Sequence, residues 1–242
     1  MMIKFILIVL IIFTTSIHSQ QQKKYFDAPF GGGIGYVPAW YLPNIDPINT
    51  ELQNIGIPNL STSGFYSSGG AGFIYVGFIK FLRVGGMGYG GSISTSEVIN
   101  GLNKEVMYHL SGGGLTVEYT LPFIKDMGLS VGAVIGAGSL EIQMFSNTGS
   151  FTWQNTWDEF GSDSTDSFNR TLNNSFWTFT PTLNLDVPIN RFIVVRLGVG
   201  YQIAFNDDWT ADNDQRLDGV PSDLTANSFF IQSGIFLGFF SF

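Results

Sequence analysis

The sequence predicts an all-β protein: an eight-stranded antiparallel up-and-down transmembrane β-barrel with a short helix in its first long loop. Apolar residues make up 44% of the 242 residues and aromatic residues 15%, whereas only 12% are charged, about half the share of a typical soluble domain. Beyond the first 20 residues or so, no apolar stretch is long enough for a spanning helix, so the apolar residues must alternate along strands. Residues 229–242 form an apolar, glycine-spaced run, as expected of a strand that closes a barrel.

The first residues have the order of a secretory signal peptide. Lys4 precedes the apolar residues 5–13, and small polar residues follow up to Ser19. The apolar run is shorter than the roughly 20 residues that a spanning helix needs. We therefore expect residues 1–19 to be a cleaved signal peptide and residues 20–242 to be the barrel domain.

Eight stretches rich in Phe, Tyr, Ile, Val and Gly are predicted strands: 27–37, 66–79, 81–93, 104–120, 128–146, 175–187, 191–206 and 227–242. The connections between them alternate in length. The short ones are Lys80, 121–127 and 188–190, and the long ones are 38–65, 94–103, 147–174 and 207–226. Short turns at one end and long loops at the other are typical of outer-membrane barrels.

Strands 175–187 and 191–206 show the clearest alternation. Their odd positions are apolar, from Trp177 to Phe205, and their even positions are mostly Thr, Asn, Gly, Gln or charged. Glycine and short polar side chains suit a narrow lumen. We therefore expect the odd positions to face lipid.

The alternation changes phase in the fourth and fifth predicted strands. Apolar residues occupy even positions up to Leu110 and odd positions from Leu115, across the three glycines 112–114, and a similar change occurs near Gly138. A β-bulge shifts the phase of a strand in this way. We therefore expect one bulge in each strand, at about the same height.

The first long loop contains a predicted helix at residues 46–56. It starts with Asp-Pro and ends at glycine, which are helix boundary signals. Ile48, Leu52 and Ile55 would form one apolar face. The helix either packs on the rim or serves as a plug or lid over the lumen.

Four charged residues fall on predicted lumen faces: Arg83, Glu118, Asp186 and Arg196. Buried charges must be paired, so an ion-pair network that closes the lumen is expected. A selective pore would use the same residue types. Because eight strands leave room only for side chains or one small ligand, we favour the closed network.

His109, Ser111 and Glu141 are a weaker constellation. A histidine, a serine and an acid can form an activated nucleophile, and the slipped phase would point His109 and Ser111 in one direction. The His-x-Ser spacing resembles that of the lipid A deacylase barrels, whose acid follows the serine more closely. We favour an interior hydrogen-bond cluster and expect no enzymatic activity.

The sequence favours no cofactor or metal. It has no cysteine, and Asp212-Asn-Asp214 lacks the glycine and spaced glutamate of a calcium loop. Eleven Lys and Arg face 19 Asp and Glu, a net charge of −8 that disfavours nucleic acid as a partner.

Leader, strand count, alternating loops and terminal phenylalanine together resemble the small Gram-negative outer-membrane barrels of the OmpA, OmpX and OmpW type. The resemblance implies a bacterial outer-membrane location, with lipid and lipopolysaccharide as partners. It implies a structural or surface-loop interaction role, with a narrow channel for small or apolar solutes as the alternative and modification of outer-membrane lipid as a second alternative. In such families the barrel-assembly machinery reads the last strand, where Phe236, Phe240 and Phe242 occupy alternate positions.

The last predicted strand is apolar on both faces. Gln232, Gly234 and Gly238 favour an inward even face, whereas the sorting signal would place Phe240 and Phe242 outward. A bulge near Gly238 would reconcile the two. In either case the strand should pair with residues 27–37 and close the sheet.

Overall fold

The computed structural model describes residues 29–124, 126–149, 151–162, 167–206 and 208–241. The predicted signal peptide lies outside these residues, as does Phe242. The order of the described elements is β1 (Phe30–Tyr36), β2 (Ala39–Pro43), α2 (Asp46–Asn54), β3 (Phe65–Tyr75), β4 (Leu82–Ile99), β5 (Leu102–Thr120), β6 (Gly128–Asn147), α3 (Trp153–Phe160), β7 (Phe168–Asn190), β8 (Ile193–Phe205), β9 (Trp209–Ala211), β10 (Gln215–Leu217) and β11 (Ser228–Ser241). Neither helix has the length and apolar character that a membrane crossing requires, within this part of the chain.

The strands form a closed antiparallel ring with eight positions. β1 and β2 share the first position, because both pair with β3 and with β11. The ring then runs through β4, β5, β6, β7 and β8, and β8 pairs with β11. The predicted eight-stranded barrel is thus confirmed, and the last strand pairs with the first over residues 30–36 and 235–241.

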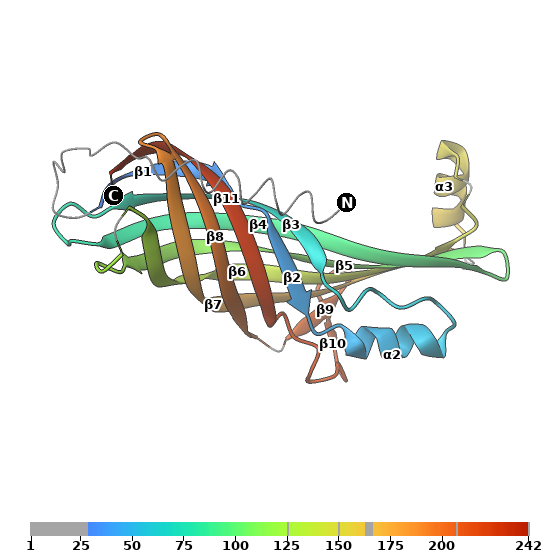
Figure 1. Ribbon diagram of the computed structural model, residues 1–242. Helices are drawn as coiled ribbons and strands as arrows, with labels where there is room; N and C mark the ends of the chain where they lie inside the picture. Colours follow the sequence, from blue (N-terminus) through green and yellow to red (C-terminus); the bar gives the residue numbers. More distant parts are fainter. Residues whose placement is uncertain (1–28, 125, 150, 163–166, 207, 242) are drawn as a thin grey trace, which may run out of the picture.

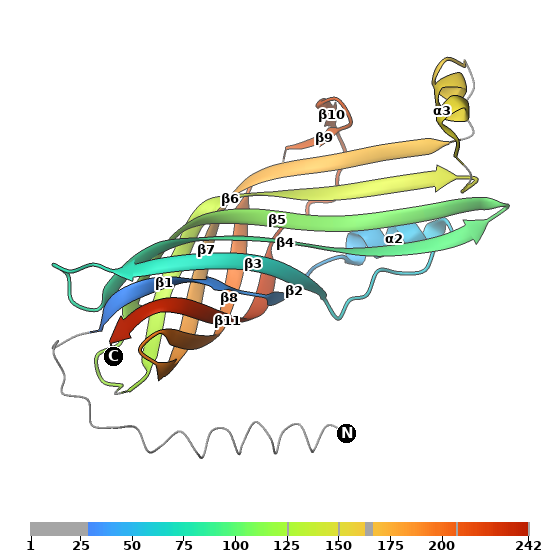
Figure 2. The same cartoon turned by 90° about the horizontal axis from the view of Figure 1, so that it is seen from above.

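The barrel has two dissimilar ends (Figure 1). The turns between β3 and β4, β5 and β6, and β7 and β8 lie at the end that holds the C-terminus. At the other end β4 to β7 project well beyond β8 and β11, with α2, α3 and the β9–β10 hairpin around them (Figure 2). We call the two parts of the barrel the turn half and the loop half.

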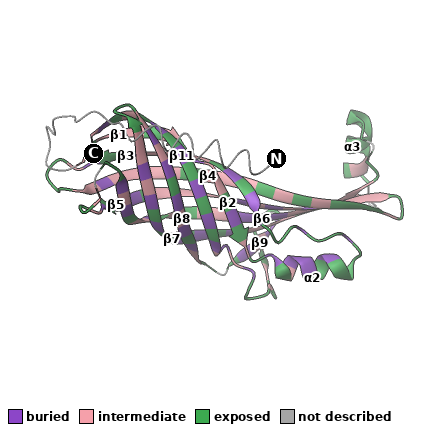
Figure 3. Ribbon diagram, viewed as in Figure 1, coloured by how far each residue is buried: buried purple, intermediate pink, exposed green. Residues whose placement is uncertain are grey.

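Side chains alternate in and out of the ring as predicted for the sixth and seventh strands. Buried and exposed residues form alternating stripes along β7, β8 and β11 (Figure 3). Trp177 is 71% exposed, whereas its neighbour Thr178 is 4% exposed. In β11 the even positions from Ser228 to Phe236 and Phe240 are buried, and the pairing with β1 keeps one register across Gly238. The prediction from Gln232, Gly234 and Gly238 that the even face points inward is therefore confirmed, and the bulge near Gly238 does not form.

The predicted bulges in the fourth and fifth strands are also wrong. β5 pairs with β6 in one unbroken register from Asn103 opposite Asn147 to Thr120 opposite Ser130, and the β4–β5 and β6–β7 pairs are equally continuous. Even positions of β5 face inward along its whole length: Val106, Tyr108 and Leu110 are buried in the loop half, and Thr116, Glu118 and Thr120 in the turn half. β5 keeps the same inward and outward positions along its whole length. Its inward residues are apolar in the loop half and polar in the turn half, and its outward residues show the reverse.

That exchange divides the barrel at the height of Gly113. In the turn half the inner face holds charged and polar residues together with a buried aromatic cluster around Phe73, and the outer face is apolar, with Leu115, Ile135 and Trp177 all more than half exposed. In the loop half the inner face is apolar, and the outer face carries polar residues such as Ser111, Glu141 and Asn173. Lipid around the turn half and water around the loop half would produce this pattern.

Two predicted long connections are wholly or partly strand. Residues 94–103 were expected to form a long loop, but β4 and β5 continue to a tight turn at Asn100 and Gly101, both with positive φ (54° and 82°). β6 and β7 likewise extend to residues 147 and 168, leaving α3 at their tip. These segments carry polar residues on their outward face, as a strand in water does, and the criterion of an apolar outward face did not identify them as strands.

Candidate functional site: a closed lumen and its cover

The four predicted lumen charges come together in the turn half. They lie on β4, β5, β7 and β8, and each of the four residues is at most 5% exposed. β-strand alternation places each side chain inside the ring, because every one of them lies on the inward parity of its strand. Two arginines and two acids balance in charge.

Every charge in this network has a partner of opposite sign. Arg83 donates from Nε to Glu118, from Nη1 to Asp186 and from Nη2 to Ser130 Oγ at 2.6 Å. Arg196 donates from Nε and Nη2 to the two Asp186 oxygens at 2.7 and 3.0 Å, and its Nη1 lies 3.7 Å from Glu118 Oε1. Arg83–Glu118 and Arg196–Asp186 join neighbouring strands, whereas Arg83–Asp186 and Arg196–Glu118 bridge the lumen between strands that are not neighbours in the ring.

Neutral side chains extend the network to the last strand. Asn184 Nδ2 donates to Glu118 Oε1 at 2.6 Å, and Gln232 Nε2 donates to Asn184 Oδ1 at 2.7 Å. Phe73 lies beneath both guanidinium groups, whose Cζ atoms are 4.5 and 5.1 Å from its ring centre. Such contacts stabilise a cation that has lost its water.

Two small voids lie among the lumen side chains. One cavity beside the network is lined in part by Glu118, Asn184 and Arg196. The volume in which the centre of a water molecule fits there is about 10 Å³. A second cavity nearer the loop half, lined in part by Tyr41, Tyr89 and Gln202, has the same size. Each volume corresponds to about one water molecule.

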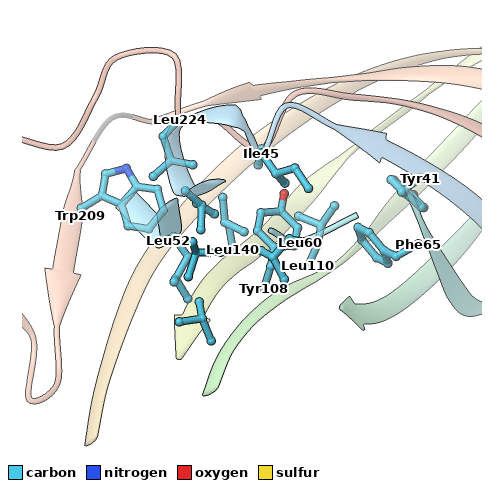
Figure 4. Packing of buried hydrophobic residues seen from close by; sticks show 14 of the residues in the cluster. Tyr41, Ile45, Leu52, Leu60, Phe65, Tyr108, Leu110, Leu140, Trp209 and Leu224 are labelled. Carbon is cyan, nitrogen blue, oxygen red and sulfur yellow. The ribbon is translucent and has the colours of Figure 1, made fainter. Parts of the chain in front are cut away.

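The loop half of the lumen is filled by an apolar cluster (Figure 4). Tyr108, Leu110 and Leu140 contribute from the sheet, and Ile45 and Leu60 from the segments around α2, all at most 2% exposed. Tyr41 stacks between Tyr89 and Phe230 at ring-centre distances of 5.2 and 4.9 Å. This cluster is a second barrier in series with the charges.

The helix α2 covers the cluster. Ile48 and Leu52 are 7% and 2% exposed, but Ile55 is 51% exposed, so the predicted apolar face holds for two of its three residues. α2 ends at Asn54, and Ile55 already lies in the turn that follows. Asn49 fixes the helix to the returning chain, because its side chain both donates to the carbonyl oxygen of Leu60 (3.1 Å) and accepts from the backbone N–H of Leu60 (2.8 Å).

The sequence placed Asn184 and Gln232 on the lumen face, but sequence reasoning did not connect them, or Ser130, to the charged residues. All three share the inward parity of the charges and hydrogen-bond within the network. The predicted bulge in β5 placed Tyr108 on the outer face. Its hydroxyl is buried without a hydrogen-bond partner among the described residues.

His109, Ser111 and Glu141 do not lie in the lumen. They occupy odd positions, which face outward in β5 and β6, so the expected interior hydrogen-bond cluster is wrong. His109 is directly opposite Glu141 in the register, and Ser111 is opposite Ser139. Within the described chain no hydrogen bond joins the three residues, and Glu141 accepts from Gln143 Nε2 at 3.4 Å.

The acidic loop residues are partly engaged by protein groups. Asp212 pairs with Arg170 at 3.2 Å and accepts from the backbone N–H of Thr171 at 3.1 Å, and Asp218 pairs with Arg216. Among the residues that the structure describes, no three acidic or histidine side chains converge as a metal site would require.

Of the predicted sorting residues, Phe236 and Phe240 point into the lumen. They are 0% and 3% exposed and pack with Phe73. The apolar residues of β11 that face outward are Phe229, Ile231, Ile235, Leu237 and Phe239.

No protein-family model matches this chain, and no curated protein sequence matches it. Solved structures with a similar arrangement include Ail, the attachment invasion locus protein of Yersinia pestis, at 11% identity and a TM-score of 0.41, covering 88% of this chain and 100% of that one. A major outer membrane protein from Thermus thermophilus aligns at 8% identity and a TM-score of 0.49 (86% and 99% covered), and OprG from Pseudomonas aeruginosa at 10% and 0.39 (92% and 97% covered). The likeness concerns the fold alone. By its own closed ring of eight antiparallel strand positions, this chain has the architecture of the small outer-membrane β-barrels.

Proposed function

We propose that the protein is a non-enzymatic outer-membrane barrel with a closed lumen, which acts through the surfaces of its loop half. The observation that carries the proposal is the buried ion-pair network, in which Arg83 alone contacts acids on two strands and a serine on a third. Lipid and lipopolysaccharide would surround the barrel.

The outer surface of the turn half supports a position in a bilayer. Outward residues between Trp177 and Val187 on β7 are all apolar, a span of 11 residues. A transmembrane strand needs about 9–11 residues. The short turns would then face the periplasm and the loop half the outside.

The interior supports a closed barrel over a pore. An ion that enters must displace paired charges in the turn half and part the apolar cluster in the loop half. Both barriers consist of side chains that are almost completely buried. Breaking a buried ion pair leaves an uncompensated charge, at a penalty of about 3–5 kcal/mol.

Planar-bilayer recording tests this proposal. Purified full-length protein, shown to be folded by its altered gel mobility before heating, should give no steady conductance. The double variant Arg83→Ala/Asp186→Ala removes one positive and one negative group and opens space at the network, so it serves as the leaky comparison. A stable open level in the unaltered protein would contradict the closed-lumen proposal.

Hydrolysis of outer-membrane lipid is a second candidate, favoured by one observation. His109 and Glu141 are direct cross-strand neighbours on the outer face, with Ser111 two residues from His109 on that same face. They lie just above the height of Trp177, where lipid headgroups would be expected. Side chains directly opposite in a sheet have Cβ atoms about 4.5–5.5 Å apart, within reach of a base and its orienting acid.

The lipid profile of cells tests this candidate. Lipid A from cells that express the unaltered protein should differ from lipid A of cells with Ser111→Ala if Ser111 is a nucleophile. Ser139→Ala is the matched control, because Ser139 lies opposite Ser111 on the same face. Identical profiles for the unaltered protein and Ser111→Ala would remove the candidate.

A further inference from the structure

A row of aromatic side chains is exposed on the helix α3. Trp153, Trp157 and Phe160 follow one another at spacings of four and three residues, so they lie on one face of the helix. Their side chains are 79%, 55% and 84% exposed, and no residue of α3 is buried. A group of large exposed aromatic side chains is typical of a contact site.

The position of α3 places this aromatic row far from the turn half. Figure 1 and Figure 2 both show α3 at the tip of the projecting strands, at the end opposite the C-terminus. Ala137 is opposite Gly113, and β6 continues from there for ten residues to Asn147. At about 3.3 Å per residue, α3 lies roughly 30 Å along the sheet beyond the boundary at Gly113. The aromatic row is therefore outside the bilayer that would surround the turn half.

The helix has little support from the rest of the chain. Thr152 caps its start by accepting from the backbone N–H of Asn155 at 3.2 Å, and at its end the N–H of Gly161 donates to the carbonyl oxygen of Trp157 at 3.1 Å. α3 has eight residues, whereas an isolated helix shorter than about 12–15 residues is only marginally stable in water. Most helices gain their stability by packing one face. A surface that covers the aromatic row would supply that packing.

The rings are arranged at steep angles to one another. The planes of Trp153 and Trp157 are 70° apart with their centres 5.7 Å apart, and those of Trp157 and Phe160 are 89° and 6.3 Å apart. In such an edge-to-face pair, the ring that contributes its edge keeps its π faces free for a third group. Tryptophan faces are the best aromatic sites for an organic cation, and clustered aromatic rings are how proteins hold quaternary ammonium groups.

The charges around the row favour a cationic surface. Residues 151–162 contain Asp158 and Glu159 and no Lys or Arg. Gln154 and Asp158 each follow a tryptophan of the row, and the Gln154 amide donates to the Asp158 carboxylate at 3.0 Å. Glu159 accepts from the backbone N–H of Ser167 at 3.1 Å. The two carboxylates repel an anionic surface and attract one whose outermost groups are positive.

We propose that the aromatic row of α3 binds the choline headgroups of a phosphatidylcholine bilayer that belongs to another membrane. The outermost group of this lipid is a trimethylammonium cation, which carries no N–H and is suited to an aromatic face beside a carboxylate. Tryptophan also favours the interface of a bilayer. The inference rests on the proposed function only in that the loop half must face outward, and it does not depend on whether the lumen conducts. Bilayer recording and vesicle binding therefore fail independently.

Vesicle flotation with full-length protein tests the inference. Protein kept soluble by a non-ionic amphipol should float with phosphatidylcholine vesicles, several-fold less with phosphatidylethanolamine vesicles and not with phosphatidylglycerol vesicles. Free phosphocholine should release it. Absence of binding to phosphatidylcholine would overturn the inference, and so would equal binding to phosphatidylcholine and either of the other two lipids.

The variant Trp157→Leu keeps an apolar side chain in the middle of the row and removes the π face. It should weaken binding to phosphatidylcholine vesicles about tenfold. Asn155→Leu is the matched control, because it places the same leucine on the opposite face of α3, and it should leave the affinity unchanged. Altered gel mobility before heating shows that the barrel of each variant is folded. Equal affinities of the two variants would overturn the inference. If the protein without vesicles dimerises and Trp157→Leu abolishes the dimer, the row binds a second copy and the assignment to choline is wrong.

Discussion

The turn half and the loop half share the four long strands β4 to β7, but the two faces of those strands exchange their chemistry at Gly113. Below that height the charged network and an aromatic cluster around Phe73 fill an interior that is enclosed by apolar side chains. Above it an apolar interior is enclosed by polar ones. Because the register does not change, the difference teaches that the surroundings decide which face of a strand is apolar.

The two interiors are stabilised in different ways. In lipid, outward apolar residues gain nothing from leaving water, so the turn half must be held together by its backbone ladder, by the hydrogen bonds and ion pairs across the lumen, and by the packing of the aromatic cluster around Phe73. In water, the loop half can bury apolar surface under α2 and the β9–β10 hairpin, as a soluble domain does. Substitutions in the two halves should therefore act by different mechanisms.

The largest effect is expected from Asp186→Ala in the turn half. Asp186 binds both Arg83 and Arg196, so its removal leaves two buried cations with only Glu118 as an acidic partner. Breaking a buried pair lowers the free energy of unfolding by about 3–5 kcal/mol. Denaturant titration in lipid vesicles, followed by tryptophan fluorescence, measures the loss.

Asp218→Ala is the control for that loss. Asp218 pairs with Arg216 at 3.0 Å in a loop where both side chains are more than 80% exposed. Exposed pairs contribute about 0–1 kcal/mol. Similar losses for the two variants would mean that the lumen network is not the main support of the turn half.

Leu140→Ala tests whether the interior of the loop half behaves as a soluble core. Leu140 is completely buried in the apolar cluster, so the shorter side chain leaves a cavity and should lower the free energy of unfolding by about 2–5 kcal/mol. Leu115→Ala, at a position 72% exposed on the outer face of the turn half, leaves no internal cavity and should cost less. A larger loss for Leu115→Ala in the same titration would reverse the comparison.

A positive charge on the outer face locates the boundary between lipid and water. Val117→Arg, near the middle of the apolar belt, should destabilise the protein by about 2–4 kcal/mol in vesicles. Met107→Arg lies on the same face of the same strand, ten residues farther up in the loop half, and should change stability by less than about 0.5 kcal/mol. Equal effects of the two charges would contradict the boundary at Gly113.

The sequence was sufficient for the ring because the residues of the turn half obey one rule along each strand. Strand number and the closing pair followed from the eight strand-like stretches and the alternating loop lengths, and the inward charges followed from the alternation along each strand. The loop half was misjudged because Val106, Tyr108 and Leu110 alternate with the opposite phase, and a slip of the strand was inferred where the solvent changes. His109 and Ser111 were turned inward by the same error.

Contacts between distant segments could not be predicted from the sequence, for a different reason. The pairing of β9 with β7 and the two hydrogen bonds between Asn49 and Leu60 depend on where the long loops return in space. Loop lengths and turn residues do not determine that path.

The smallest effect concerns packing density within the turn half, where two adjacent glycines of β4 differ. A Cβ atom on the inward Gly85 would lie 2.0 Å from the carbonyl oxygen of Gly72 and 2.9 Å from Thr116 Oγ1, whereas one on the outward Gly86 would meet nothing nearer than 3.5 Å. Gly85→Ala should therefore lower the free energy of unfolding by about 1–3 kcal/mol through overpacking, and Gly86→Ala should change it by less than about 1 kcal/mol. The same titration compares them. If Gly85→Ala is as stable as Gly86→Ala, the lumen beside Gly85 has room for an added methyl group, and the interior of the turn half is loosely packed. Such a result would contradict the closed lumen.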